Sequence, residues 1–253
     1  MTAPFRRIAA ELRQQILDGT LAPGDLVPSE AELAARYGTS RETARKAMTE
    51  LKREGYVQSA QGARSRVRRP TPTLMQSTGA VWRQRRAGGT ANFNAQMAVL
   101  GQKAEQRLLF VEIVAATPEV GERLQIPDGA NVILRRVLML VDGAPIQRSD
   151  GYYPASLFAD TPIARNERVA GGVAAYIEDA MGRRIVRFVE RVAARLPRPD
   201  ECLDLQIDPG VPVARLLRTA FDESATPVEL LDTVAVGDRH VYEYEIDVPP
   251  PGM

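Results

Sequence analysis

The chain has 253 residues, of which 44% are hydrophobic and 26% are charged, so two modest domains could each bury a core. No apolar run reaches the roughly 20 residues that span a bilayer, and the first seven residues lack the apolar stretch of a signal peptide. The single Cys202 excludes an internal disulfide and a thiolate metal cluster within one chain. We therefore expect a cytoplasmic protein without a membrane span, a metal site or another cofactor.

Positive charge is concentrated near the N-terminus, although the net charge of the whole chain is only +1. Residues 1–70 hold 13 Lys and Arg against 8 Asp and Glu, while the remaining residues hold 20 against 24. A basic end on an acidic body suits phosphate binding by that end. An excess of five charges over 70 residues also arises by chance, so this signal leaves both readings open.

The first helices are predicted by apolar spacing and by capping residues. Ile8, Leu12 and Ile16 recur every four residues and predict a helix that ends at Gly19. Ser29 and Glu32 form a capping box for a second helix, which would end at Gly38.

A third helix is predicted to follow at once. A second capping box over residues 39–42 would start it, and Gly55 would end it. Its predicted buried stripe is Ala44, Ala47, Met48 and Leu51. Two short helices joined by residues 37–39 have the form of a helix-turn-helix. Residues 56–59 and 65–68 are predicted strands around Gln61 and Gly62, a hairpin that would form a wing.

The third helix carries side chains that suit a DNA groove. Hydroxyl groups and a helix N-terminus suit phosphate contacts, and arginine suits paired hydrogen bonds to guanine. The alternative is an ordinary solvated basic face. The candidates are Ser40, Arg41, Thr43, Arg45 and Lys46.

Residues 5–69 resemble the winged helix-turn-helix of the GntR family of bacterial regulators. The matching segments occur in family order over residues 16–19, 21–25, 27–30, 32–34, 40–45 and 51–56. The resemblance implies DNA contacts from Ser29, Ser40, Arg41, Thr43 and Arg45, with Gln61 and Gly62 at the tip of the wing. Ala31 stands where some members have an arginine, so that contact should be absent here.

Residues 70–92 are predicted to form a linker, because prolines near its start make it stiff and residues 87–90 form a flexible break. Its arginines could simply be solvated or could touch flanking phosphates.

The remaining residues alternate between predicted strands and short helices. The predicted strands are residues 108–115, 132–141, 145–153, 185–194, 213–221, 228–236 and 241–248, and the predicted helices are 118–124 and 173–181. Residues 124–132 and 205–213 are similar, and each stretch lies between a short helix and a strand. The sequence therefore predicts a duplicated helix-strand-strand unit and one mixed, mainly antiparallel sheet.

This region resembles the UTRA effector-binding domain, which has a chorismate-lyase-like fold. The resemblance rests on the turn and its proline at residues 142–145, on residues 152–154 and 227–229, and on residues 237–239. Together the two resemblances imply the HutC-like branch of the family and an α+β fold class. The expected organisation is a DNA-binding domain at 1–69, a linker at 70–92 and an effector-binding and dimerisation domain at 93–253.

Several positions depart from the phosphate grip that is common in this family. Leu138 and Met139 stand near a usual arginine, and Gly172 and Ala174 stand where Ser and Tyr are usual. We therefore expect an effector less charged than a sugar phosphate. Ser149 replaces a usual glutamate, whereas Glu229 is kept. The candidate contacts are Arg136, Ser149, Asp150, Tyr152 and Glu229, and each of these residues could instead only satisfy its sheet neighbours.

The sequence thus predicts a homodimeric, ligand-responsive repressor of a pseudo-palindromic operator in double-stranded DNA. The alternatives are a chorismate-lyase-like enzyme and a DNA-binding plasmid or architectural regulator that needs no ligand. A fold does not carry its chemistry with it, and the lone His240 is more typical of a structural residue than of a catalytic one. We expect no catalytic residue.

Overall fold

The computed structural model describes residues 3–58, 64–68, 73–76, 93–99 and 101–244. The chain forms two compact units, residues 1–72 with 196–212 and residues 73–195 with 213–253. Each unit is described by itself. The domain boundaries expected at residues 69 and 92 remain predictions.

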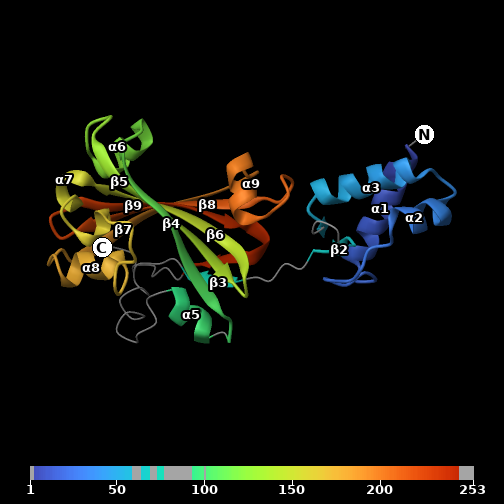
Figure 1. The fold of residues 1–253 in the computed structure, drawn as a ribbon, viewed down its shortest axis with the longest axis horizontal. Helices are drawn as coiled ribbons and strands as arrows, with labels where there is room; N and C mark the ends of the chain where they lie inside the picture. Colours follow the sequence, from blue (N-terminus) through green and yellow to red (C-terminus); the bar gives the residue numbers. More distant parts are fainter. Residues whose placement is uncertain (1–2, 59–63, 69–72, 77–92, 100, 245–253) are drawn as a thin grey trace, which may run out of the picture. The chain divides into compact units, whose positions relative to one another are not determined.

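Three helices and a short hairpin form the N-terminal part of the first unit (Figure 1). The Ser29 hydroxyl accepts from the Glu32 amide and the Glu32 carboxylate accepts from the Ser29 amide, which confirms the predicted capping box. The helix ends at Gly38, whose φ of 59° lies in the left-handed region that glycine adopts without strain. The elements are α1 (Pro4–Leu17), α2 (Glu30–Tyr37), α3 (Arg41–Arg53), β1 (Val57–Gln58) and β2 (Arg66–Val67).

The start of α3 differs from the prediction of a capping box over residues 39–42. Ser40 is the N-cap residue, and its hydroxyl accepts from the Thr43 amide. Thr43 therefore occupies the position at which a glutamate would complete a capping box, so Glu42 cannot close one.

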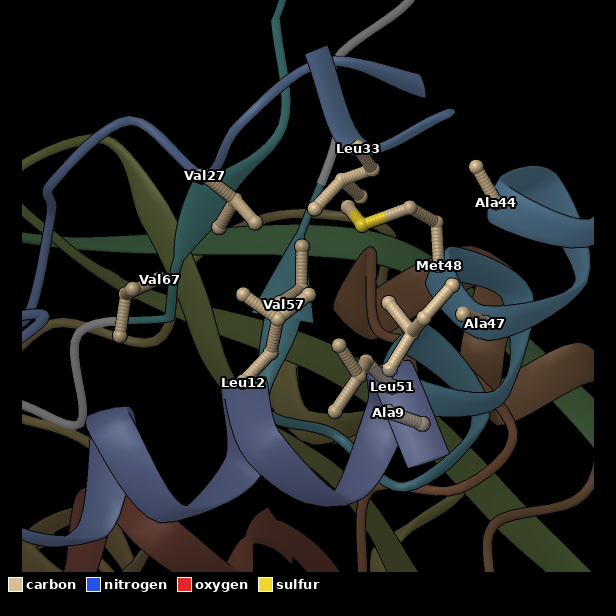
Figure 2. Packing of buried hydrophobic residues seen from close by; sticks show 11 residues of the cluster. Ala9, Leu12, Val27, Leu33, Ala44, Ala47, Met48, Leu51, Val57 and Val67 are labelled. Carbon is tan, nitrogen blue, oxygen red and sulfur yellow. The ribbon is translucent and has the colours of Figure 1, made fainter. Parts of the chain in front are cut away.

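The three helices and the hairpin share one apolar cluster (Figure 2). Leu12 of α1, Leu33 of α2 and Leu51 of α3 are all fully buried in it. Val57 and Val67 join from the two strands, where they are register partners. The four predicted α3 residues are buried, so the opposite side of α3 is fixed as its exposed face.

The second unit is built on a six-stranded sheet with the order β4-β5-β6-β9-β8-β7, and all five pairings are antiparallel. Its strands are β4 (Ala104–Ala115), β5 (Asn131–Val141), β6 (Ala144–Pro154), β7 (Ile185–Arg195), β8 (Val213–Asp222) and β9 (Pro227–Val236). Its short helices are α5 (Phe93–Val99), α6 (Pro118–Leu124), α7 (Ala155–Phe158) and α8 (Val173–Asp179), with 3-10 turns η1 (Pro162–Ala164) and η2 (Gly237–Arg239).

Two further strands, one before and one after the six in the chain, form a separate parallel pair. Strand β3 (Thr73–Gln76) pairs with β10 (His240–Glu243). Residues 73–76 belong to the predicted linker, so part of it forms a strand that the sequence analysis did not predict. Of the predicted strand at 241–248, residues 241–243 lie in β10, and residues 245–248 lie outside the described residues.

The predicted internal repeat is confirmed and is longer than expected. The order β4-α6-β5-β6 recurs along the chain as β7-α9-β8-β9, where α9 spans Pro199–Leu205. Both helices begin with proline and end at a left-handed glutamine, Gln125 with φ 53° and Gln206 with φ 52°. The two halves of the sheet join where β6 pairs with β9, and Asp150 lies directly opposite Asp232 there.

Helices lie on both sides of this sheet (Figure 1). We name the sides by one helix each. On the α6 face, α6 packs against a cluster that includes Val132, Leu217 and Leu230. On the α8 face, α7, η1 and α8 pack against a cluster that includes Ile133 and Tyr153. Successive strand residues point to opposite faces, so the position of a side chain along a strand decides which face it serves.

Candidate functional site

The exposed face of α3 carries the predicted DNA-contacting side chains. Arg41 and Arg45 are exposed, and they lie on one side of the helix because they are four residues apart. No ion pair or hydrogen bond joins either guanidinium to the described residues. Lys46, by contrast, forms an ion pair with Glu42 at 3.1 Å.

The hydroxyl residues at the start of α3 have a local structural role as well. The Ser40 and Thr43 hydroxyl oxygens are 3.0 Å apart, and the Thr43 amide donates to Ser40 at 3.2 Å. These bonds fix the first turn, where unpaired amides give a helix its affinity for anions.

A groove of about 370 Å³ adjoins this face, between α2 with the loop before it, α3, and the two residues that precede β2. Ser29 and Arg41 are among its lining residues, as is Arg64, which the sequence analysis did not select. Arg64 forms an ion pair with Glu32 at 2.9 Å. Hydrogen bonds from Ser29 hold the pKa of that carboxyl below its usual value. The basic run at residues 64–68 was the available signal for Arg64. Gln61 and Gly62 lie outside the described residues.

Three of the five predicted effector contacts lie on the α6 face. Arg136 donates two hydrogen bonds to Asp150, at 2.7 and 2.6 Å, and it also lies over the Phe110 ring. Tyr152 is on the same face and packs against the α6 cluster, where burial raises the pKa of its hydroxyl. Arg136 and Asp150 therefore satisfy each other.

Ser149 and Glu229 lie on the opposite, α8 face. The Ser149 and Thr233 hydroxyl groups form a 2.8 Å hydrogen bond with each other, and the Ser149 Oγ also accepts a hydrogen bond from the Gln147 side-chain amide at 3.1 Å. Glu229 accepts a 2.9 Å hydrogen bond from the Tyr153 hydroxyl. That hydroxyl stays protonated, because burial first, and then the Glu229 carboxylate, raises its pKa well above the usual value.

The structure thus does not bring the five predicted contacts together, because Asp150 and Ser149 are neighbours on one strand and must face opposite ways. Thr233 and Arg218, which the sequence analysis missed, share the α8 face with Glu229. The alternation of residues 147, 149 and 151 along β6 was the signal that could have separated the two sets.

The lone histidine is buried and structural in its contacts. The His240 Nδ1 lies 3.0 Å from the Val236 carbonyl oxygen, and burial lowers its pKa to about 4, so the ring is neutral near pH 7. No cluster of three or more potential metal ligands occurs among the described residues. Within the same part of the chain, no helix combines the length and apolar character needed to cross a membrane.

Comparison with known families agrees with this geometry. Residues 4–67 match the model described as bacterial regulatory proteins, gntR family, and residues 100–241 match the UTRA domain. The chain belongs to the GntR family of bacterial regulators and carries a UTRA domain.

The relatives of this GntR-family chain match it along almost its whole length. An uncharacterized HTH-type transcriptional regulator of Streptomyces coelicolor is 29% identical over 98% of this chain and 94% of the relative. The HTH-type transcriptional regulator GgaR of Escherichia coli is 25% identical, over 96% and 91%. The repressor NagR of Bacillus subtilis is 23% identical, over 96% and 94%.

Solved structures support the same fold. A crystal structure of a GntR-family transcriptional regulator has a TM-score of 0.62 at 26% identity and covers 98% of this chain and 99% of that one. The structure of PhnF from Mycobacterium smegmatis has a TM-score of 0.58 at 23% identity, with coverages of 95% and 99%, and it bears on the fold alone. This GntR-family member is therefore a transcriptional regulator with a DNA-binding and a ligand-binding domain.

Proposed function

We propose that the protein is a repressor that binds a pseudo-palindromic operator as a homodimer and leaves it when a small-molecule effector binds. Residues 1–69 carry the DNA contacts, through Ser29, Ser40, Arg41, Thr43, Arg45, Lys46, Gln61 and Gly62. Residues 93–253 carry the effector site and the dimer contacts, and residues 70–92 connect the two. The observation that carries the proposal is that Arg41 and Arg45 are exposed on a capped helix and form no ion pair or hydrogen bond through their guanidinium groups with the residues that the structure describes.

The dimer follows from the geometry of operators. One recognition helix covers half of a site, and two helices on successive major grooves must be about 34–36 Å apart. An effector that favours a conformation with another spacing would lower operator affinity by no more than its differential affinity for the two conformations. The name of the related NagR, a repressor, favours this sign of regulation.

The effector site that we propose lies on the α8 face and includes Ser149 and Glu229. Both are buried polar residues on the two central strands. The other three predicted contacts would support this site from the α6 face. Arg136 and Asp150 hold β5 to β6, and Tyr152 packs against the α6 cluster. A chorismate-lyase-like activity would require turnover of substrate by the protein without DNA, and an architectural role would require equal affinity for all sequences.

The DNA-binding proposal is tested with Arg45→Ala. If Arg45 hydrogen-bonds a guanine, the substitution weakens operator binding by about 1–3 kcal/mol and reduces discrimination between operator and random DNA. Fluorescence anisotropy on a footprinted promoter fragment measures both quantities.

The matched control is Arg36→Ala, which also removes one positive charge. Arg36 is an exposed residue at the end of α2 and forms an ion pair with Glu11 of α1. An equal loss for both variants, or unchanged discrimination in Arg45→Ala, would remove Arg45 from base recognition. Absence of any salt-sensitive, sequence-selective binding by the wild-type protein would reject the repressor itself.

A further inference from the structure

The groove beside α3 has a lining that carries more positive than negative charge. Two arginines, Arg41 of α3 and Arg64, line it together with Glu30. Its remaining walls are apolar or carry hydroxyl groups: Val27, Pro28, Ser29, Ala31, Met48 and Ser65. A DNA backbone combines matching features, because deoxyribose presents C–H surface and each phosphate carries a negative charge. The lining therefore suits one sugar and phosphate of a DNA strand.

Arg64 has a partner in the free protein, but the pair is exposed. The Arg64 Nη2 donates to the Glu32 Oε2 at 2.9 Å, and the two side chains keep 52% and 58% of their surface accessible. Exposed pairs of this kind contribute little to stability, because water screens the charges and two long side chains lose freedom. A phosphate that binds Arg64 would therefore displace Glu32 at a small cost.

Glu32 has a second role that does not need Arg64. Its Oε2 also accepts a 2.6 Å hydrogen bond from the Ser29 amide, which closes the capping box of α2. Hydrogen bonds from Ser29 are the largest causes of the lowered pKa of this carboxyl, whereas the attraction of Arg64 contributes least to it. The cap of α2 therefore stays in place when Arg64 changes its partner.

We propose that Arg64 binds a backbone phosphate of the operator in this groove, and that Glu32 holds its guanidinium beside the groove until DNA arrives. Phosphate replaces the carboxylate because arginine forms paired, charge-assisted hydrogen bonds with it. This inference rests on the proposed DNA binding and adds a residue that gives affinity without reading the sequence.

The first test is Arg64→Ala in the full chain, with anisotropy titrations on the footprinted promoter fragment and on random DNA. Both affinities should fall by the same factor, since the phosphates are the same in every sequence. One lost phosphate contact lowers the slope of log affinity against log salt by about 0.9. The gap between the wild-type and variant affinities should therefore shrink about threefold between about 50 and about 200 mM salt.

The second test is a double-mutant cycle with Glu32→Gln. Glutamine serves a capping box as glutamate does, but it has no charge with which to hold the guanidinium. We expect Glu32→Gln to raise the affinity for both DNAs by a factor about threefold larger, or more, with Arg64 present than in Arg64→Ala.

The matched control is a second exposed pair, Arg36 with Glu11, whose Nη2 and Oε1 are 3.0 Å apart. Among the described residues, neither of these two lines the groove. The cycle of Arg36→Ala and Glu11→Gln should show no coupling in DNA binding. Melting temperatures within about 2 °C of the wild type confirm that all variants fold.

Three outcomes would overturn the inference: an unchanged salt slope in Arg64→Ala, a loss confined to the operator, or an equal gain from Glu32→Gln in both backgrounds. A loss confined to the operator would make Arg64 a reader of bases, and an equal gain would mean that Glu32 only repels DNA. If the wild-type protein selects its operator while Arg64→Ala keeps the salt slope, only this inference is rejected. A wild-type protein without selective binding would instead reject the repressor proposal.

Discussion

At the scale of single residues, the only histidine gives the clearest pH dependence. Burial lowers the pKa of His240 to about 4, below its usual 6.5, so the folded state binds this proton less readily than the unfolded state. The stabilising contribution is therefore complete above pH 6.5 and is lost as the pH falls toward 4. We expect the free energy of unfolding to drop by about 2 kcal/mol between pH 6.5 and 5.

This window is informative because no second histidine titrates in it. His240→Asn keeps a donor for the Val236 carbonyl oxygen but cannot titrate, so it should flatten the profile. Urea denaturation followed by circular dichroism at each pH measures the difference. Parallel profiles for the two proteins would show that His240 is not the group responsible.

Residue-level prediction succeeded where a side chain acts on its own element and was incomplete where partners come from other strands. The Ser29 cap was readable, because Glu32 is three residues away. That Asp150 pairs with Arg136, and that Glu229 lies beside Arg218, depends on the register of four strands. The register cannot be read directly from one sequence, so the candidate effector contacts were chosen without knowing on which face of the sheet each residue lies.

At the scale of elements, the repeat gives a paired stability prediction. Gln125 and Gln206 are exposed and end their helices in the left-handed region, which an L-residue adopts at a cost that glycine avoids. We expect Gln125→Gly and Gln206→Gly each to raise the free energy of unfolding by about 0.5–1 kcal/mol, after the added entropy of the unfolded chain is subtracted.

Chemical denaturation of the single variants checks both values, and Gln14→Gly is the matched control. Gln14 is exposed inside α1, where glycine should destabilise by about 0.5–1 kcal/mol. If all three substitutions destabilise, the conformation at the two helix ends is not the left-handed one.

Most elements were predictable because their signals are local. Alternating or continuous apolar runs, glycine stops and the turn at residues 142 and 143 set the positions of the long strands and of α6. Strand β3 was missed because a four-residue strand near prolines has no periodicity to detect, and its pairing partner β10 is more than 160 residues away.

At the scale of the whole molecule, the proposed dimer makes the spacing of the operator testable. Two heads that dock on successive major grooves require half-sites about 10–10.5 base pairs apart, or a multiple of this distance. An insertion of five base pairs turns the second half-site to the opposite side of the duplex. We expect the affinity of the dimer for this duplex to fall to about that for a single half-site, because the second DNA-binding domain can no longer reach the major groove of its half-site. An insertion of ten base pairs should restore part of the affinity. Anisotropy titrations with the three duplexes at one salt concentration compare these affinities directly, since the phosphate contribution then stays the same. Equal affinity for all three spacings would mean that the heads bind independently, in which case an effector could not release DNA by changing the distance between them.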